Sequence, residues 1–390
     1  MLSNSHSTLL WLFTEHRNAT FTINFVLPCK TAGEQLKVRY ESWSSEEVSH
    51  HGLEKMISIL RNKASGTLPD AAIFSRFVTP HGTALIALCK SLGIVTIFHL
   101  DDLLQHIPAD IGQKYTAIYS ETYMVELQEC IHASDGIIAA TPILAANLAK
   151  LYPQRIIRAV MGVCYAPVSG WSAKGMRSRA ARFKRGLSTI GAQTIGYMGS
   201  SSHLRDLATI TPQIAELMRT RPQLHFETLG LPTPDILKAE FGDRVREYGY
   251  SRSYADFLST LYELNWDLGL APLVQDDFNQ AKTATKFVEY TACSIPTLAE
   301  NIEPYSSVDP KNRGIALAVG GMWARIAADL LSNPDTRQRQ LRHAQTLCRS
   351  SLTGSTALNQ LLAAINQLSP KCREPRKTGG VDEVLLQNLV

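Results

Sequence analysis

The sequence predicts an α/β protein made of two Rossmann-like domains that face each other across a cleft. Short apolar runs that suit buried strands alternate with amphipathic helical patterns in both halves of the chain, which is typical of a doubly wound parallel sheet. A basic, small-residue segment separates the halves, and 390 residues suffice for two separate cores. We therefore predict an N-terminal domain at 1–168, a linker at 169–193, a C-terminal domain at 194–368 and a tail at 369–390.

The sequence predicts six strands and at least four helices in the first half of the chain. Gly93 is a stop signal between a helix and a β-branched strand, and Thr141 with Pro142 supplies the cap and first position of another helix. Strands are expected at 21–27, 36–40, 71–74, 94–98, 135–139 and 155–160, and helices at 51–63, 83–92, 115–133 and from 141 onward.

The second half repeats the alternation. Pro296 ends the helix that follows Ala281, because proline cannot continue a helix. Strands are expected at 194–197, 224–229, 245–248, 268–273 and 296–299, and helices at 206–219, 254–264, 320–333, 335–347 and 356–367.

The bulk composition is that of an ordinary globular protein, with 45% hydrophobic and 19% charged residues. The net charge is +4, and Lys and Arg residues form no concentrated run, so we expect no nucleic-acid partner. The seven cysteines are far apart and form no CxxC pair, which favours reduced, mostly buried thiols in a cytoplasmic protein over disulfides or a zinc site.

No apolar stretch in the sequence is long enough to cross a bilayer. The short apolar run at 9–13 is followed by Glu15, His16 and Arg17 and lacks the pattern of a signal peptide. We expect a cytoplasmic protein, and any membrane contact would be peripheral, at the inner membrane face.

The stretch 266–305 reads as one strand, polar loop, helix and strand. Its polar residues gather where the first strand ends and the helix begins, which is where open α/β sheets bind ligands. Lys282, Lys286 and Glu289 lie in this region. Two ammonium groups and a carboxylate suit an anionic, hydroxyl-rich ligand such as a nucleotide diphosphate.

Three segments give the chain a resemblance to a known family. They are residues 134–142 (SDGIIAATP), 195–200 (IGYMGS), and the set 269–273 (GLAPL), 278–282 (FNQAK), 286–290 (KFVEY) and 295–296 (IP). Over roughly 70–365 the sequence resembles the GT-B glycosyltransferases, specifically the retaining, glycogen-synthase-like group. The third set is similar to a bacterial branch that builds surface polysaccharides.

The resemblance implies an enzyme that transfers a hexose or deoxyhexose from a nucleotide-sugar donor, with retention, to a glycan or lipid-linked glycan acceptor. The nucleotide-sugar is a substrate, so no cofactor is expected. GT-B enzymes generally need no metal for catalysis, and we expect none.

The resemblance also implies donor-binding residues in the C-terminal domain. A carboxylate at Glu289 would accept hydrogen bonds from ribose, while Lys282 and Lys286 would neutralise the diphosphate. Backbone amides of a small-residue turn would approach phosphates. The alternative is an ordinary loop and a solvated helix face, with Phe278 in the core. The donor-binding set is Gly199, Ser200, Ser201, His203, Arg205, Phe278, Asn279, Lys282, Lys286 and Glu289.

Candidate catalytic residues follow a strand of the N-terminal domain. His99, Asp101 and Asp102 come after the apolar run at 94–98, and in similar enzymes such a loop lies near the transferred sugar or the acceptor hydroxyl. An Asp there could orient that hydroxyl or act as a base. The alternative is a helix N-cap at either Asp. Arg76, after another strand, is a candidate for acceptor or phosphate binding or a surface arginine.

One departure from the family pattern keeps other functions open. Family members often carry two Glu residues eight positions apart in the donor helix; Glu289 matches the second, but Ala281 occupies the first. The alternatives are a non-catalytic glycan- or nucleotide-binding subunit of a polysaccharide assembly complex, or a GT-B-fold nucleotide-sugar epimerase.

Overall fold

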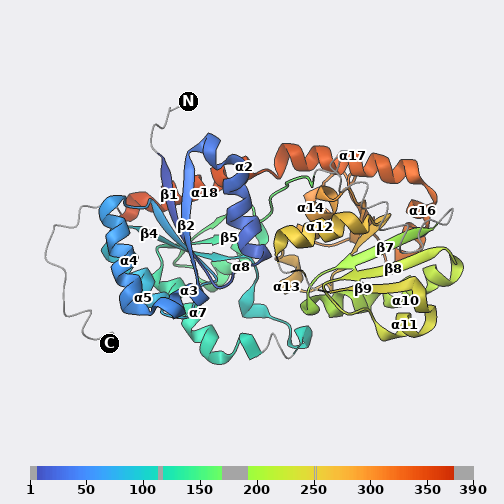
Figure 1. Ribbon diagram of the computed structural model, residues 1–390, viewed down its shortest axis with the longest axis horizontal. Coiled ribbons are helices and arrows are strands. Elements are labelled where there is room, and N and C mark those ends of the chain that lie inside the picture. The colour runs from blue at the N-terminus through green and yellow to red at the C-terminus, as the bar shows by residue number, and fades with distance from the viewer. Residues whose placement is uncertain (1–6, 113–116, 169–191, 250, 252, 373–390) are drawn as a thin grey trace. The chain divides into compact units, whose positions relative to one another are not determined.

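The computed structural model describes residues 7–112, 117–168, 192–249, 251 and 253–372 (Figure 1). The described chain divides into two compact units. The first unit takes its residues from Met1–Asp101, Tyr119–Gly162 and Gly354–Val390, and the second from Asp102–Ile118 and Val163–Thr353.

The first unit contains a six-stranded parallel sheet in the order β2-β1-β3-β4-β5-β6. The order reverses between β1 and β3, which makes this the sheet's topological switch point. The strands are β1 (Thr8–Thr14), β2 (Val38–Ser44), β3 (Ala71–Ser75), β4 (Val95–Leu100), β5 (Gly136–Ala139) and β6 (Ile156–Ala159). The described helices are α1 (Ala19–Phe21), α2 (Leu27–Leu36), α3 (Ser45–His51), α4 (Leu53–Gly66), α5 (Gly82–Ser91), α7 (Glu121–Ala133), α8 (Pro142–Leu151) and α18 (Gly354–Cys372), with a π-helical turn at Thr22–Val26.

The second unit contains another six-stranded parallel sheet, in the order β12-β11-β10-β7-β8-β9, with its switch point between β10 and β7. The strands are β7 (Gln193–Met198), β8 (Leu224–Leu229), β9 (Val245–Tyr248), β10 (Leu268–Ala271), β11 (Thr297–Glu300) and β12 (Ala316–Ala318). The described helices are α10 (Leu204–Thr220), α11 (Asp235–Phe241), α12 (Tyr254–Leu264), α13 (Asp277–Gln280), α14 (Thr285–Ala292), α15 (Tyr305–Val308), α16 (Trp323–Ser332) and α17 (Pro334–Ser351). Two parallel sheets with flanking helices confirm the predicted Rossmann-like domains.

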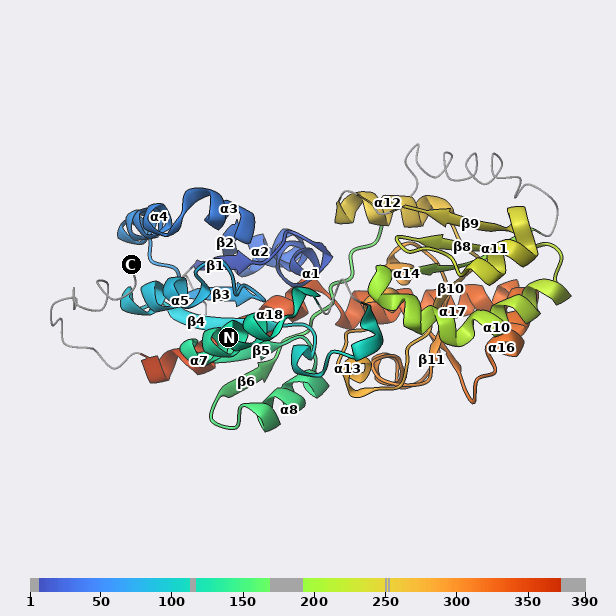
Figure 2. The ribbon, with the colours of Figure 1, turned by 90° about the horizontal axis from the view of Figure 1, so that it is seen from below.

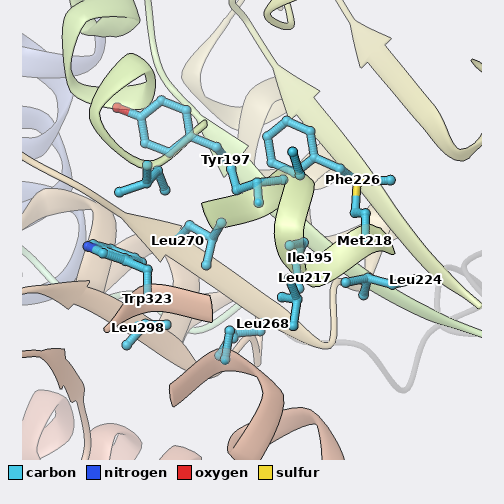
Figure 3. Packing of buried hydrophobic residues seen from close by; sticks show 14 of the residues in the cluster. Ile195, Tyr197, Leu217, Met218, Leu224, Phe226, Leu268, Leu270, Leu298 and Trp323 are labelled. Carbon is cyan, nitrogen blue, oxygen red and sulfur yellow. The ribbon is translucent and has the colours of Figure 1, made fainter. Parts of the chain in front are cut away.

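The core of the second unit lies between its sheet and helices α10 and α16 (Figure 3). Leu268 and Leu270 of β10 and Phe226 of β8 meet Leu217 of α10 and Trp323 of α16 in one buried cluster. The central strands are buried apolar runs and the helices are amphipathic. Both patterns are visible in the sequence, which explains why most of these elements were predicted closely.

Two strand glycines make room for aromatic side chains at the switch point. A Cβ on Gly196 of β7 would lie 2.0 Å from the Trp266 ring, and one on Gly269 of β10 would lie 2.8 Å from the Tyr290 ring. These rings pack edge-on with centroids 6.1 Å apart. The glycines let aromatic rings lie directly on β7 and β10 and so fix the strands that carry the candidate site.

The predicted strand at 21–27 was wrong, because this segment is helical. The Asn18 side chain accepts a hydrogen bond from Phe21 N at 3.1 Å and caps α1. Phe21 and Phe25 are four residues apart, so in a helix they share a face, and both enter the core of the first unit. The first strand is instead β1, whose apolar residues the sequence showed only as a short run.

The C-terminal helix α18 packs with the first unit, where it lies beside the blue and green elements of that unit (Figures 1 and 2). Leu358, Leu361, Ile365 and Leu368 are buried against the first sheet's core. The prediction had placed 356–367 in the C-terminal domain, so the division of the chain differs there. It also differs at Asp102–Ile118, which belongs to the second unit.

Six cysteines lie in the part of the chain whose side chains are described, and all six carry free thiols, five of them buried. This agrees with the expectation of reduced thiols. None of the helices in the described residues is both long and apolar enough to span a bilayer.

Candidate functional site

The second unit brings most of the predicted donor-binding residues to its switch point. The loop after β7 carries Gly199, Ser200, Ser201 and His203, and the connection after β10 leads through α13 to α14. Because β7 and β10 are adjacent and parallel, their carboxyl ends open on the same edge of the sheet. This is the edge at which open α/β sheets bind ligands.

The loop after β7 is tightly wound. Gly199 N donates to the Leu229 carbonyl at 3.0 Å, and a Cβ on Gly199 would come within 3.1 Å of the His203 ring. The Ser200 and Ser202 hydroxyls are 2.7 Å apart. A short 3-10 turn at Ser201–His203 then leads directly into α10. The close approach at Gly199 explains the small residue, and it places the first turn of α10 at the sheet edge.

A buried network joins this loop to the connection after β10. His203 Nδ1 lies 2.9 Å from Asp206 Oδ2, and Asp206 Oδ1 accepts hydrogen bonds from Val274 N and Asn279 Nδ2, each at 3.0 Å. Burial raises the pKa of Asp206, but the hydrogen bonds from His203 and Val274 N and the charge of Lys282 outweigh it and leave that pKa lowered. An ionised Asp206 can only accept, so His203 donates through Nδ1.

His203 is held neutral at this position. Burial lowers its pKa to about 3, and the charges of Lys286 and Lys282 act in the same direction, while Asp206 opposes them. The positive charges of the two lysines therefore act on the loop after β7. An anionic ligand bound there would balance these charges.

Helix α14 carries two of the charged candidates in buried positions. Lys286 is 8% exposed and Glu289 is 6% exposed. Burial lowers the pKa of Lys286 to about 8, opposed by the charge of Asp206. Burial raises the pKa of Glu289 to about 7, opposed by Lys286 and by a hydrogen bond from Tyr254. Buried, oppositely shifted groups at a sheet edge are typical of a functional site.

The lysine side chains rest on aromatic rings. Lys286 Nζ lies 5.5 Å from the centroid of the Tyr197 ring, and Lys282 Nζ lies 4.6 Å from that of Phe278. Phe278 itself is 5% exposed, which agrees with the core-packing alternative for this residue. The rings position the ammonium groups without neutralising them.

Arg205 has carboxylate partners in the second unit. Its Nη1 lies 2.7 Å from Asp110 Oδ1, and its Nη2 pairs with Asp276. The same residues, with His106 and Phe278, line an open pocket of about 440 Å³. In this arrangement Arg205 binds carboxylates of the chain, so a diphosphate would have to compete with them.

Two of the candidate catalytic residues, His99 and Asp101, lie close together at the carboxyl end of β4. His99, 2% exposed, lies at the end of β4 with its Nδ1 2.9 Å from Ser75 Oγ, and burial lowers its pKa to about 4. Asp101 accepts from Thr20 at 3.0 Å, while Asp102 belongs to the second unit. The nearest 3-10 turn has Leu103 as its N-cap, so neither Asp caps it.

Arg76 occupies the switch point of the first unit. Its Nη1 lies 3.3 Å from Asp101 Oδ1, its Nε lies 3.9 Å from Glu15 Oε2, and its Nη2 donates to the Tyr119 hydroxyl. Burial raises the pKa of Asp101, but the charge of Arg76 outweighs it and leaves that pKa lowered. Arg76 is therefore part of a polar cluster, and the prediction of a surface arginine is excluded.

Sequence reasoning missed Asp206 and Tyr254 in the second unit, and Glu15 and Tyr119 in the cluster around Arg76. The contact between His203 and Asp206 could have been predicted, because the two residues are three positions apart at the start of a predicted helix, where such side chains are neighbours. The pairing of Arg205 with Asp110, 95 residues away, had no local signal.

No protein-family model matches the sequence, and no curated protein sequence matches it. Solved structures do match. HepE of Anabaena, in complex with UDP and glucose, is 13% identical with a TM-score of 0.61, covering 93% of this chain and 100% of that one. The fold is that of GT-B glycosyltransferases.

Two further structures share this GT-B fold. A glycosyltransferase from Rickettsia africae has a TM-score of 0.65 at 10% identity and covers 93% of this chain and 99% of that one. The sucrose-phosphate synthase of Thermosynechococcus elongatus has a TM-score of 0.60 at 12% identity, with 93% and 100% covered. At such identities the likeness establishes the GT-B fold, as the resemblance predicted.

Proposed function

We propose that the protein is a glycosyltransferase that moves a hexosyl or deoxyhexosyl group from a nucleotide-sugar to a glycan or lipid-linked glycan, with retention, in surface-polysaccharide synthesis. One observation carries the proposal. Lys286 and Glu289 are both buried on α14 at the switch point of the second unit, where Lys282 and His203 join them electrostatically.

The charges of this site fit a diphosphate. Lys282 and Lys286 face one ionised partner, Asp206, because His203 is neutral and Glu289 has a pKa of about 7. Holding the half-buried Lys282 beside the buried Lys286 without a full counter-charge is costly. A bound diphosphate supplies that counter-charge, and its charge grows as the sugar departs. Stabilising this leaving group is the largest catalytic effect expected of the site.

Glu289 fits the ribose. A carboxylate has two oxygens and can accept hydrogen bonds from two neighbouring hydroxyls. The Glu289 carboxylate also accepts a hydrogen bond from the Tyr254 hydroxyl. HepE, which shares the fold, was solved with UDP and with UDP-glucose. This supports a uridine diphosphate sugar as the first donor to test.

In this proposal the first unit presents the acceptor. Asp101 is an ionised carboxylate at the carboxyl end of β4 and is the group we assign to orienting the acceptor hydroxyl. His99 is held against Ser75, so its role is to position the end of β4. Asp102 remains a candidate for contact with the transferred sugar.

A second candidate function is a nucleotide- or glycan-binding subunit without activity. It is favoured by Ala281, which is fully buried and stands where related enzymes place the Glu that contacts the sugar. With no carboxylate there, binding of a nucleotide could persist without transfer.

Product analysis tests the proposed function. UDP-, GDP- and dTDP-sugars are incubated with and without a mixture of methyl glycosides, and products are identified by mass spectrometry and by the anomeric signals in proton NMR. A new glycoside with the donor's anomeric configuration is expected only when acceptor is present. A sugar epimer formed without acceptor would identify an epimerase, and nucleotide binding without any product would identify the inactive subunit.

A further inference from the structure

The first unit holds a second polar cluster that the donor site does not use. Glu15 follows β1, Arg76 follows β3 and Asp101 follows β4, so the three side chains converge on the switch-point edge of the first sheet. Their side chains are 22%, 16% and 13% exposed, respectively. Charged groups this sheltered at such an edge occupy the position of a ligand site in an open α/β sheet.

Two tyrosines complete the cluster. The Tyr119 hydroxyl accepts from Arg76, whose guanidinium lies 5.6 Å from the centre of the Tyr119 ring. Tyr119 packs edge-on against Tyr123, with centroids 5.4 Å apart. A small set of converging polar groups beside aromatic rings is the usual lining of a small-molecule site.

The Tyr123 hydroxyl is the observation that points to a ligand. Tyr123 is 9% exposed, and its buried hydroxyl has no hydrogen-bond partner among the described residues. It lies within electrostatic reach of Glu15, Arg76 and Asp101. A buried tyrosine hydroxyl nearly always has a partner, so a ligand hydroxyl bound among these charges would satisfy it.

The charge of the cluster restricts the ligand. Glu15 and Asp101 are two carboxylates around one guanidinium, Arg76, so the three groups sum to one negative charge. Carboxylates accept hydrogen bonds from hydroxyl or ammonium groups and repel other anions.

We propose that Glu15, Arg76, Asp101 and Tyr123 form a hexopyranose subsite that takes a neutral sugar or an amino sugar and rejects uronates and phosphosugars. It rests on the proposed function only in identifying this sugar as the acceptor. The subsite belongs to the first unit, so its binding can be measured without a nucleotide.

The test uses methyl glucoside, methyl glucosaminide and methyl glucuronide as probes on the full chain. Dissociation constants are measured by saturation-transfer difference NMR. The glucuronide is expected to bind about tenfold more weakly than the glucoside, because like charges meet. Equal binding of glucuronide and glucoside, or no binding of any glycoside, would overturn the proposal.

Two variants locate the binding. Tyr123→Phe removes only the hydroxyl and is expected to weaken glucoside binding about fivefold, the usual effect of one hydrogen bond. Glu15→Gln removes one negative charge and is expected to narrow the difference between glucuronide and glucoside to about twofold or less. The matched control, Glu46→Gln, changes an exposed carboxylate on α3 and should leave all three affinities unchanged.

An unchanged glucoside affinity in Tyr123→Phe contradicts the subsite. Nucleotide release from a UDP-sugar is measured on the same samples. Glycoside binding without any nucleotide release would refute the proposed function and keep the subsite. Nucleotide release together with a glucoside affinity that Tyr123→Phe leaves unchanged would refute the subsite and keep the proposed function.

Discussion

Asn279 Nδ2 donates to Asp206 Oδ1 over 3.0 Å and thereby joins α13 to the first turn of α10. The same amide donates to the Val274 carbonyl at 2.9 Å, and Asp206 also receives Val274 N. The two loops that flank the switch point of the second unit are thus held by one buried carboxylate. This contact makes Asn279 a positioning residue.

Replacing Asn279 by Ala is expected to lower the free energy of unfolding by about 1–3 kcal/mol, because Asp206 loses a buried donor. Nucleotide affinity should fall equally for UDP, GDP and dTDP, since the loops loosen without a change in base contacts. Urea denaturation and calorimetric titration measure both quantities. Asn301→Ala, at an exposed position, is the control, and a selective loss for one base would show that Asn279 contacts the base.

The pH dependence of nucleotide binding follows from α14. Lys286 is charged below its pKa of about 8, and Glu289 is charged above its pKa of about 7. If both charged forms bind the ligand, UDP affinity rises as the pH increases to 7 and falls as it passes 8. Titrations between pH 5.5 and 9.5 measure this profile.

Variants assign the two limbs of this profile. Lys286→Met should abolish the fall in UDP affinity above pH 8. Glu289→Gln should abolish the loss of affinity at low pH that is due to protonation of Glu289, while the loss that is due to protonation of the nucleotide's phosphate remains. An affinity that stays constant from pH 6 to 9 would show that these two groups do not touch the nucleotide.

The packing of Trp266 on β7 makes Gly196 sensitive to a single methyl group. A Cβ there would lie 2.0 Å from the indole, so Gly196→Ala is expected to cost about 1–3 kcal/mol of stability through overpacking. Gly66→Ala is the matched control, because a Cβ at Gly66 meets no atom within 4 Å. Chemical denaturation of both variants measures the difference, and equal stabilities would refute this packing.

Because α18 packs in the first unit, shortening one of its buried side chains should destabilise that unit. Leu361 is 2% exposed within the core of the first unit, and Leu361→Ala should cost about 2–5 kcal/mol. Hydrogen exchange should then accelerate in β1 and β3 but not in β7. Asn359→Ala, on the exposed face of α18, should change neither, and faster exchange confined to the second unit would contradict the assignment.

Local patterns in the sequence predicted the second unit well. The run at 268–273, the polar loop and the proline at 296 led to β10, α14 and β11 within a few residues, because a buried strand and an amphipathic helix each have their own period. The same pattern predicted that Lys286 and Glu289 lie one turn apart on this helix, and both lie on α14.

Long-range packing was not predictable in the same way. An alternating run such as 21–27 satisfies a strand pattern, but in the structure the segment is helical and its Phe21 and Phe25 share a core with residues of α18, far along the chain. Arg205 was expected at a diphosphate, yet Asp110 and Asp276 bind it. Ion pairs between distant residues leave no periodic signal in a sequence.

Nucleotide release from UDP-, GDP- and dTDP-sugars by the wild type and by Lys286→Met tests the central claim most directly. We predict release from at least one donor, with kcat/KM lowered about 100- to 1,000-fold in Lys286→Met, as for loss of one preorganised group that stabilises transition-state charge. The control Lys311→Met, an exposed lysine of the second unit, should retain wild-type activity. Absence of release from every donor, or equal rates in wild type and Lys286→Met, would contradict the assignment of a glycosyltransferase site to α14.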